Sequence, residues 1–256
     1  MFKNYFKTTF RCIARQKTFP FINILGMGIA LACCLLILLF IGNELTYDSF
    51  HKDFDLIYRV YSKSELSGKI RFLHFSPAPL AGSIQNEAAG VDKLARVGVL
   101  STHWVTAGDK SIKSKITPAD SSFFELFSFP LKNHNYGPEI LDSSSDVVIS
   151  NEVAKKLFAE EEPVGKSIKI HQMGDFIITG VMKEIPANSS LDFDVLININ
   201  HISKGNLESW GSFMVETYLK LHNNVSQESL EVQFSGIAEK YIPENIMSQR
   251  NTSFHL

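Results

Sequence analysis

The triplet Gly165-Lys166-Ser167 is the one place in this 256-residue sequence that looks like nucleotide chemistry. A phosphate-binding loop ends in Gly-Lys-Ser/Thr and needs a further glycine five residues earlier, so that the backbone can wrap the phosphates. Glu160 stands at that position. The order of elements is also reversed, because a predicted helix precedes Gly165 and a predicted strand follows it. We therefore interpret Gly165 as a turn glycine and expect no nucleotide site.

Other residue types that catalyse reactions show no productive spacing. The eight histidines form no HxH or HExxH pattern, and zinc sites usually depend on such paired ligands. The sequence has no GxSxG and no SxxK motif, which mark common serine nucleophiles. We expect no catalytic, cofactor-binding or metal-binding residue, no cofactor and no enzymatic activity. A Ser–His–Asp site assembled by the fold stays open as a distant alternative.

The charge distribution divides the chain into three parts, 1–18, 19–42 and 43–256. The first part holds five basic residues and no acid, and the second holds no charged residue. The third holds the other 20 of the 25 basic residues and all 27 acidic ones, a net charge of −7. An acidic body without a basic patch argues against a nucleic-acid partner.

The uncharged part, 19–42, predicts a transmembrane helix. It has 24 residues, of which 14 are Leu, Ile or Phe, and as a helix it is about 36 Å long, enough to cross a ~30 Å hydrocarbon layer. A cleavable signal peptide needs a shorter apolar run and a small-x-small site after it, and the following GNELTYDSF offers none. Neither Cys33 nor Cys34 has the surroundings of a lipoprotein signal.

Flanking charge predicts the orientation of this helix. Basic residues stay on the cytoplasmic side, so we expect 1–18 in the cytoplasm and 43–256 outside it; the family resemblance described below implies that this membrane is a bacterial inner membrane. All three cysteines precede residue 43, so the outer domain must rest on its own core.

The basic segment 1–18 has helical spacing of apolar residues. Such a helix beside a span usually lies against the headgroups of the bilayer. A lever that meets a cytoplasmic partner and a passive anchor both fit this pattern. The apolar positions are Phe2, Tyr5, Phe6, Phe10 and Ile13, with Lys3, Lys7 and Arg11 on another face.

Periodicity in 43–256 predicts a mixed α and β domain. Ser76-Pro77 is typical of a helix start, Ser122 and Glu125 have capping-box spacing, and Ser150 precedes the helical NEVAKKLF. Ser226 is predicted to cap a helix with a stripe of Leu230, Phe234, Ile237 and Tyr241. Strands are predicted at 55–63, 93–100, 103–108, 111–117, 145–150, 166–170, 175–185, 190–199 and 212–222.

The segment INILGMGIALACCLLILLFIGNELTYDSFHKDFDLIYRVY resembles the first span and juxtamembrane entry of MacB/FtsX-like ABC transporter permeases of the Bacteroidetes type. Four further segments resemble the same family in the same order, and the set covers nearly the whole chain. They are 117–131, 147–170, 176–197 and 217–231.

The resemblance implies an α+β fold, with a porter-like subdomain that carries an inserted mostly-β subdomain in an extracytoplasmic domain. It implies a cytoplasmic ABC ATPase as partner, a permease dimer, and mechanical transmission across the membrane for export or envelope processes. Nothing in the sequence selects a cargo or an outer-envelope partner. The resemblance also implies two structural roles. The residues that would couple the span to the domain are Tyr47, Asp48, Phe50, His51, Tyr58 and Arg59. The residues that would set turns are Pro163, Gly165, Gly180 and Pro186.

Family members continue into further spans, and this sequence ends at NTSFHL without them. We therefore expect the N-terminal part of a permease. The alternative is a stand-alone membrane-anchored sensor or binding module that uses the same fold.

Overall fold

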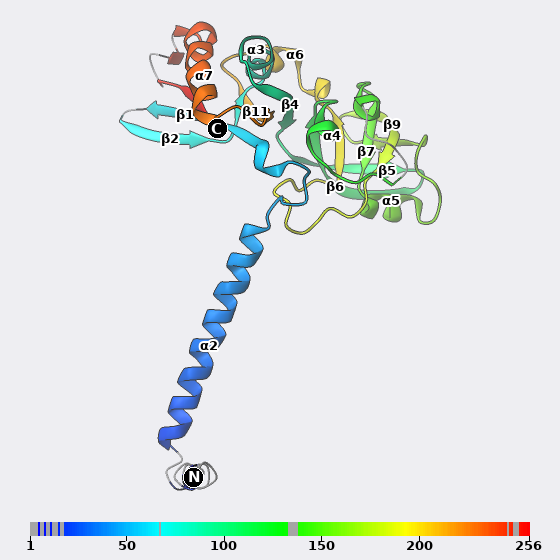
Figure 1. Cartoon of the computed structure of the whole chain (residues 1–256). Coiled ribbons are helices and arrows are strands. Elements are labelled where there is room, and N and C mark those ends of the chain that lie inside the picture. Colours follow the sequence, from blue (N-terminus) through cyan, green and yellow to red (C-terminus); the bar gives the residue numbers. More distant parts are fainter. Residues whose placement is uncertain are drawn as a thin grey trace. The chain divides into compact units, whose positions relative to one another are not determined.

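The computed structural model describes residues 5, 8, 11 and 15 and the ranges 18–66, 68–132, 138–244, 246–247 and 251–256. The chain divides into two compact units, Met1–Tyr47 and Asp48–Leu256 (Figure 1).

The first unit contains helix α2, Thr18–Leu45, which among the described residues is the one helix long and apolar enough to cross a membrane. Its 28 residues make a rod of about 42 Å, and none of its side chains is buried. The predicted run 19–42 is helical throughout. Tyr5, Thr8, Arg11 and Arg15 are helical, and the rest of the predicted amphipathic face lies outside the described residues.

The second unit is built on a twelve-stranded sheet whose main path runs β10-β7-β9-β8-β5-β6-β4-β11-β1-β12. Strand β2 pairs with β1 and β3 pairs with β11. The strands are β1 Ile57–Leu66, β2 Lys69–Leu73, β3 Ser76–Pro77, β4 Val91–Gly98, β5 Ser101–Ala107, β6 Lys110–Ala119, β7 Asp146–Ile149, β8 Ser167–Ile170, β9 Gly174–Val181, β10 Val195–Asn198, β11 Phe213–Leu221 and β12 Ser253–His255. The helices are η1 Phe54–Leu56, α3 Pro79–Glu87, α4 Phe123–Leu126, η2 Pro138–Leu141, α5 Asn151–Phe158, η3 Ile199–His201, α6 Lys204–Leu207 and α7 Gln227–Tyr241.

Six of these strands close into a barrel. Along the path β10-β7-β9-β8-β5-β6 each strand pairs with the next, and β6 pairs back with β10 in parallel. Alternate residues of these strands, such as Val105, Ile116 and Ile168, form the interior together with Leu157 of α5. Closure removes free edges from this part of the sheet. This barrel matches the mostly-β insertion that the resemblance implied.

The other half packs α3 and α7 on the antiparallel strands β4, β11, β1 and β12. Leu80 and Ile84 from α3 and Leu230 and Phe234 from α7 bury completely there. The side chain of Ser226 accepts a hydrogen bond from the Ser229 N–H and caps α7, as its position predicted.

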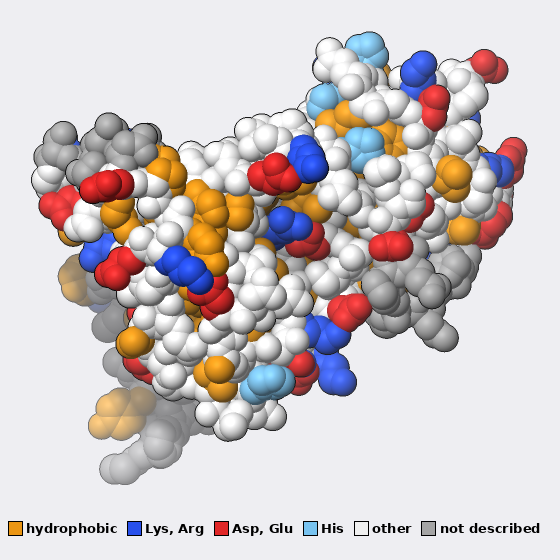
Figure 2. Space-filling model, turned by 90° about the horizontal axis from the view of Figure 1, so that it is seen from above, with side chains coloured by type: hydrophobic (Ala, Val, Ile, Leu, Met, Phe, Trp, Pro, Cys, Tyr) orange, Lys and Arg blue, Asp and Glu red, His pale blue; other side chains and the backbone are white. Residues whose placement is uncertain are grey.

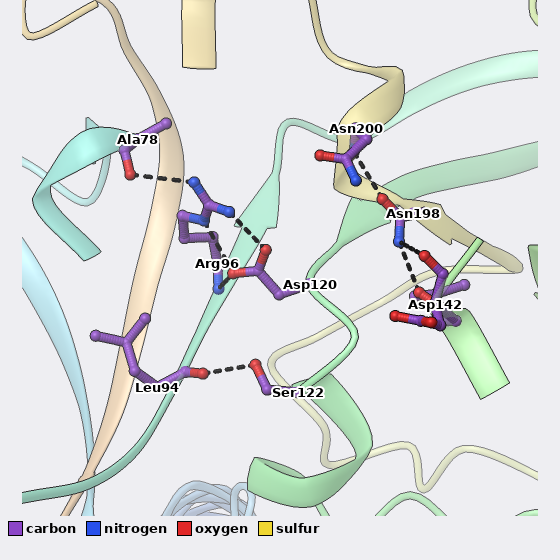
Figure 3. Close-up of polar contacts among 9 residues, drawn as sticks. Ala78, Leu94, Arg96, Asp120, Ser122, Asp142, Asn198 and Asn200 are labelled. Atoms are coloured by element: carbon purple, nitrogen blue, oxygen red, sulfur yellow. Dashed lines mark hydrogen bonds and ion pairs between the residues drawn. The ribbon is translucent and has the colours of Figure 1, made fainter. Parts of the chain in front are cut away.

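A partly buried ion pair links the two halves. The guanidinium of Arg96 on β4 donates to both carboxylate oxygens of Asp120 after β6, at 2.9 and 2.8 Å. It also donates to the Ala78 carbonyl at 3.3 Å (Figure 3). Two parallel N–H···O bonds fix direction as well as distance. Within the barrel half, the Asn198 amide on β10 donates to the carbonyls of Leu141 and Asp142, which precede β7.

Two predicted helix starts are wrong in detail. Ser76 and Pro77 form β3, and α3 begins at Pro79, because the Ser76 hydroxyl bonds Thr217 and Val215 across the sheet. Ser122 lies before α4, but its hydroxyl donates to the Leu94 carbonyl (Figure 3), so it makes no cap. In place of a capping box, Glu125 pairs with Lys93. The predicted strand 190–199 shortens to β10, Val195–Asn198.

Candidate coupling site at the start of the domain

The first residues of the domain are bound to two loops far along the chain. The Asp48 N–H donates to the Asn188 carbonyl at 2.8 Å, and its carboxylate accepts from the Ser190 N–H at 2.8 Å. Asp48 has a positive φ of 55°, which Asp tolerates better than most residues. The Lys52 N–H donates to the Ser128 hydroxyl at 2.9 Å. We call residues 48–52 the entry segment.

His51 is the buried centre of the entry segment, with 5% of its surface exposed. Its Nδ1 accepts from the Ser128 N–H at 3.2 Å, so the neutral ring carries its proton on Nε2. The ring lies among Phe50, Phe127 and Phe129, with centroids 4.0 to 5.2 Å away. Burial lowers the pKa of His51, and the nearby Asp48 carboxylate opposes the shift. The neutral form is therefore the one that the fold selects.

The aromatic neighbours of His51 continue into the core. Phe129 stacks on Phe123 at 5.6 Å and meets Phe193 edge to face at 5.3 Å. Phe127 meets Tyr218 of β11 edge to face at 5.1 Å. The entry segment thus contacts the aromatic cluster that joins the barrel to the helical half.

A cavity of about 270 Å³ adjoins the entry segment. The predicted Tyr58 and Arg59 line it. The Arg59 guanidinium lies 3.8 Å from the Glu216 carboxylate, which also accepts from the Tyr218 hydroxyl at 2.6 Å. Burial, and then the Glu216 charge, raise the pKa of Tyr218 far above its usual range. The cavity is further lined by Asp48, His51, Phe54, Ile57, Phe127, Ser190 and Tyr218.

The structure therefore brings Asp48, Phe50, His51, Tyr58 and Arg59 together in one region of the domain. Tyr47, 40% exposed, is the last residue of the first unit. Sequence reasoning missed the partners Ser128, Asn188 and Ser190. They sit in polar loops, and nothing in a single sequence indicates which loop meets residue 51.

Of the four residues expected to set turns, three lie in turns and Gly180 lies in a strand. The Pro163 carbonyl accepts from the Lys166 N–H, and Gly165 between them has a φ of +83°, as a tight turn with glycine at its third position requires. The Pro186 carbonyl accepts from the Ser189 N–H. Gly180 lies inside β9, where the pairing with β7 shifts register. It therefore marks an irregular strand pairing and not a turn.

Other chemistry in the described residues is sparse. A cavity of about 370 Å³ beside the start of α5 is lined by Ser150, Asn151, Lys183 and neighbours. In the described part of the chain no group of three or more His, Cys, Asp or Glu residues could hold a metal ion.

One hydrogen-bonded row has the residue types of a hydrolase. The Ser253 hydroxyl lies 2.9 Å from His255 Nε2, and His255 Nδ1 lies 3.3 Å from the Glu231 carboxylate. Glu231 also accepts from the Leu256 N–H, and Tyr61 stacks on the imidazole. None of the three cavities described for this domain is lined by these residues. The row is a set of contacts that attaches β12 to α7.

Charge on the visible face is mixed. Figure 2 shows Lys and Arg side chains interspersed with Asp and Glu, without a single basic field on that face. A phosphate backbone would need such a field.

The comparisons with known proteins agree with this architecture. The chain belongs to the MacB-like periplasmic core domain family, found in ABC-transporter-type permeases, and the family model matches residues 21–237. No curated protein matches the sequence.

Three solved structures resemble the fold. The first is a domain from Porphyromonas gingivalis described as part of a permease protein, with a TM-score of 0.73, 21% identity, and coverage of 80% of this chain and 90% of that one. The second is the extracellular domain of the noncanonic ABC-type transporter YknZ from Gram-positive bacteria, with a TM-score of 0.54, 12% identity, and coverage of 77% of this chain and 98% of that one. The third is the periplasmic region of MacB from Actinobacillus actinomycetemcomitans, with a TM-score of 0.49, 16% identity, and coverage of 76% of this chain and 87% of that one. The first two show the same fold.

Proposed function

We propose that this chain is a permease subunit of an ABC transporter that passes ATP-driven motion from a cytoplasmic ATPase to a domain outside the membrane. The family supports the transporter context. Five basic residues in 1–18 support a cytoplasmic N-terminus. Kinship supports a dimer of permeases. The work of the subunit is mechanical, and it needs no catalytic residue of its own.

The observation that carries this proposal is the hydrogen bonding of the entry segment. Only Thr46 and Tyr47 separate the last residue of α2 from Asp48. From Asp48 onward the backbone is bonded to the loops at 128 and 188–190 within five residues. A flexible linker would absorb a displacement, whereas a bonded entry segment delivers it to the aromatic cluster.

The test is nucleotide-dependent hydrogen exchange in the protein purified from its native membranes. We expect an ATPase to co-purify with vanadate-sensitive turnover. Trapping with ATP and vanadate should change amide exchange in 127–129 and 188–190. The double variant Asp48→Ala/His51→Phe should keep the ATPase and lose this change. Lys240→Ala on α7 removes an exposed ion pair with Glu87 at the end of α3, and this variant should behave as the unmodified protein.

Two results would contradict the proposal. Absence of any co-purifying ATPase would favour a stand-alone anchored binding module. Amide hydrogen exchange in the domain that is the same with and without nucleotide would show that no motion reaches the domain.

A further inference from the structure

The hairpin of β1 and β2 leaves one strand edge open. Strand β2, Lys69–Leu73, pairs with β1 alone among the described strands. Every residue of β2 is exposed, with Ile70 at 55% and Phe72 at 64%. The hairpin reaches past its neighbouring strands to the edge of the domain (Figure 1). A row of backbone N–H and C=O groups on that edge is free to pair with another strand.

The two faces of β2 carry different chemistry. Side chains alternate along a strand, so Ile70 and Phe72 lie on one face, and Lys69 and Arg71 lie on the other together with Leu73 at the end of the strand. Phe72 is held by an edge-to-face contact with Tyr61 at 5.8 Å. Neither Lys69 nor Arg71 has an ion-pair partner among the described residues. The edge therefore offers an apolar face and a cationic face to one incoming strand.

Charge selects the kind of strand that fits. The hairpin segment Tyr61–Leu73 holds three basic residues against one acid, in a domain where acidic residues outnumber basic ones. Pairing of two copies of β2 centred on Arg71 or Ile70 would set basic side chains directly opposite each other, which is unfavourable. A strand with acids on one face and apolar residues on the other meets both faces of β2.

We propose that β2 is a docking edge for an extended segment of a partner protein, in which acidic and apolar residues alternate. Main-chain hydrogen bonds to the free edge give affinity, and the alternation gives specificity. The acids pair with Lys69 and Arg71, while the apolar residues cover Ile70 and Phe72. This docking goes beyond the coupling proposed above and does not depend on it, because β2 needs no ATPase to bind.

The probe is an eight-residue blocked peptide of alternating glutamate and valine, added to the full-length protein in detergent micelles. We expect saturable binding, slower exchange of the β2 amides, and weakening by salt. Two N-methylated versions, on odd or on even residues, should differ, because only one of them blocks the hydrogen-bonding side of the peptide. A peptide of the same composition with glutamates and valines in separate blocks should bind at least tenfold more weakly.

Charge reversal supplies the matched variant. The variant Lys69→Glu/Arg71→Glu should bind the glutamate–valine peptide at least tenfold more weakly than the unmodified protein does. It should instead bind a peptide in which lysine replaces each glutamate. Both positions are exposed, so the variant should fold, which an unchanged thermal unfolding curve checks. Val232→Glu, at an exposed site on α7, should leave peptide binding unchanged.

Three outcomes would overturn the docking edge. Equal binding of the two N-methylated peptides would show that no strand forms. Binding of the hairpin to anionic lipid vesicles in place of the peptide would assign it to a membrane surface. Self-association that the charge reversal changes, without peptide binding, would assign it to a second copy of the chain.

Discussion

His51 is the residue whose surroundings make the sharpest prediction. It is buried among aromatic rings, and its burial lowers its pKa from the ordinary 6.5. The unfolded chain therefore binds more protons than the folded one once the pH falls below about 6.5. The contribution of His51 to stability is complete above that pH and is lost as the pH falls toward the lowered folded pKa.

We expect the free energy of unfolding of the protein to fall between pH 7.5 and pH 5, and to fall less in His51→Asn. Asparagine retains an acceptor for the Ser128 N–H but does not titrate. Urea unfolding followed by tryptophan fluorescence at each pH measures the difference. His222→Asn, at an exposed histidine, is the control and should keep the pH dependence of the original protein. An unchanged slope in His51→Asn would contradict the buried neutral imidazole.

At the scale of elements, the loop between α3 and β4 packs closely against the loop between β11 and α7, and Gly90 is the point of contact. Gly90 has a φ of +105°, and an added Cβ would lie 2.6 Å from a methyl group of Val225 in the loop before α7. The Gly90 carbonyl also accepts from the His222 N–H. Substitution there adds backbone strain and a clash, whereas Gly174, with a φ of +114°, has open space around it.

We expect Gly90→Ala to destabilise the domain by about 2–4 kcal/mol, from strain of ~1 kcal/mol and overpacking of ~1–3 kcal/mol. Gly174→Ala should cost only the strain, about 1 kcal/mol. Urea midpoints of the two variants compare them directly. An equal loss of unfolding free energy in the two variants would mean that the Val225 side chain moves aside without an energetic penalty.

Local signals explain which elements the sequence could predict. The caps Ser150 and Ser226 form as predicted, because a cap depends only on the next three residues. Ser76 and Ser122 instead bond to β11 and β4, each more than 25 residues away. Such tertiary partners override the local preference of serine. Gly180 was expected at a turn from the family resemblance, but it lies inside β9 and pairs with Val148 of β7, another non-local contact.

At the scale of the whole molecule, the apolar span, the acidic domain and its mixed fold follow from composition and periodicity. The closure of the barrel does not, because the parallel pairing of β10 with β6 joins segments more than 70 residues apart. For the candidate site, resemblance directed attention to Asp48 and His51. Their partners Ser190 and Ser128 lie 142 and 77 residues away, beyond any pattern in a single sequence.

The most direct test of the account asks which side of the membrane holds the domain. The domain has no cysteine, so Cys12, Cys33 and Cys34 are replaced by serine and one cysteine is introduced at Thr8 or at the exposed Val232. A membrane-impermeant maleimide is then applied to intact spheroplasts. We predict that Val232→Cys is labelled at once and that Thr8→Cys is labelled only after permeabilisation. Labelling of Thr8→Cys alone in intact spheroplasts would contradict a permease domain that works outside the membrane.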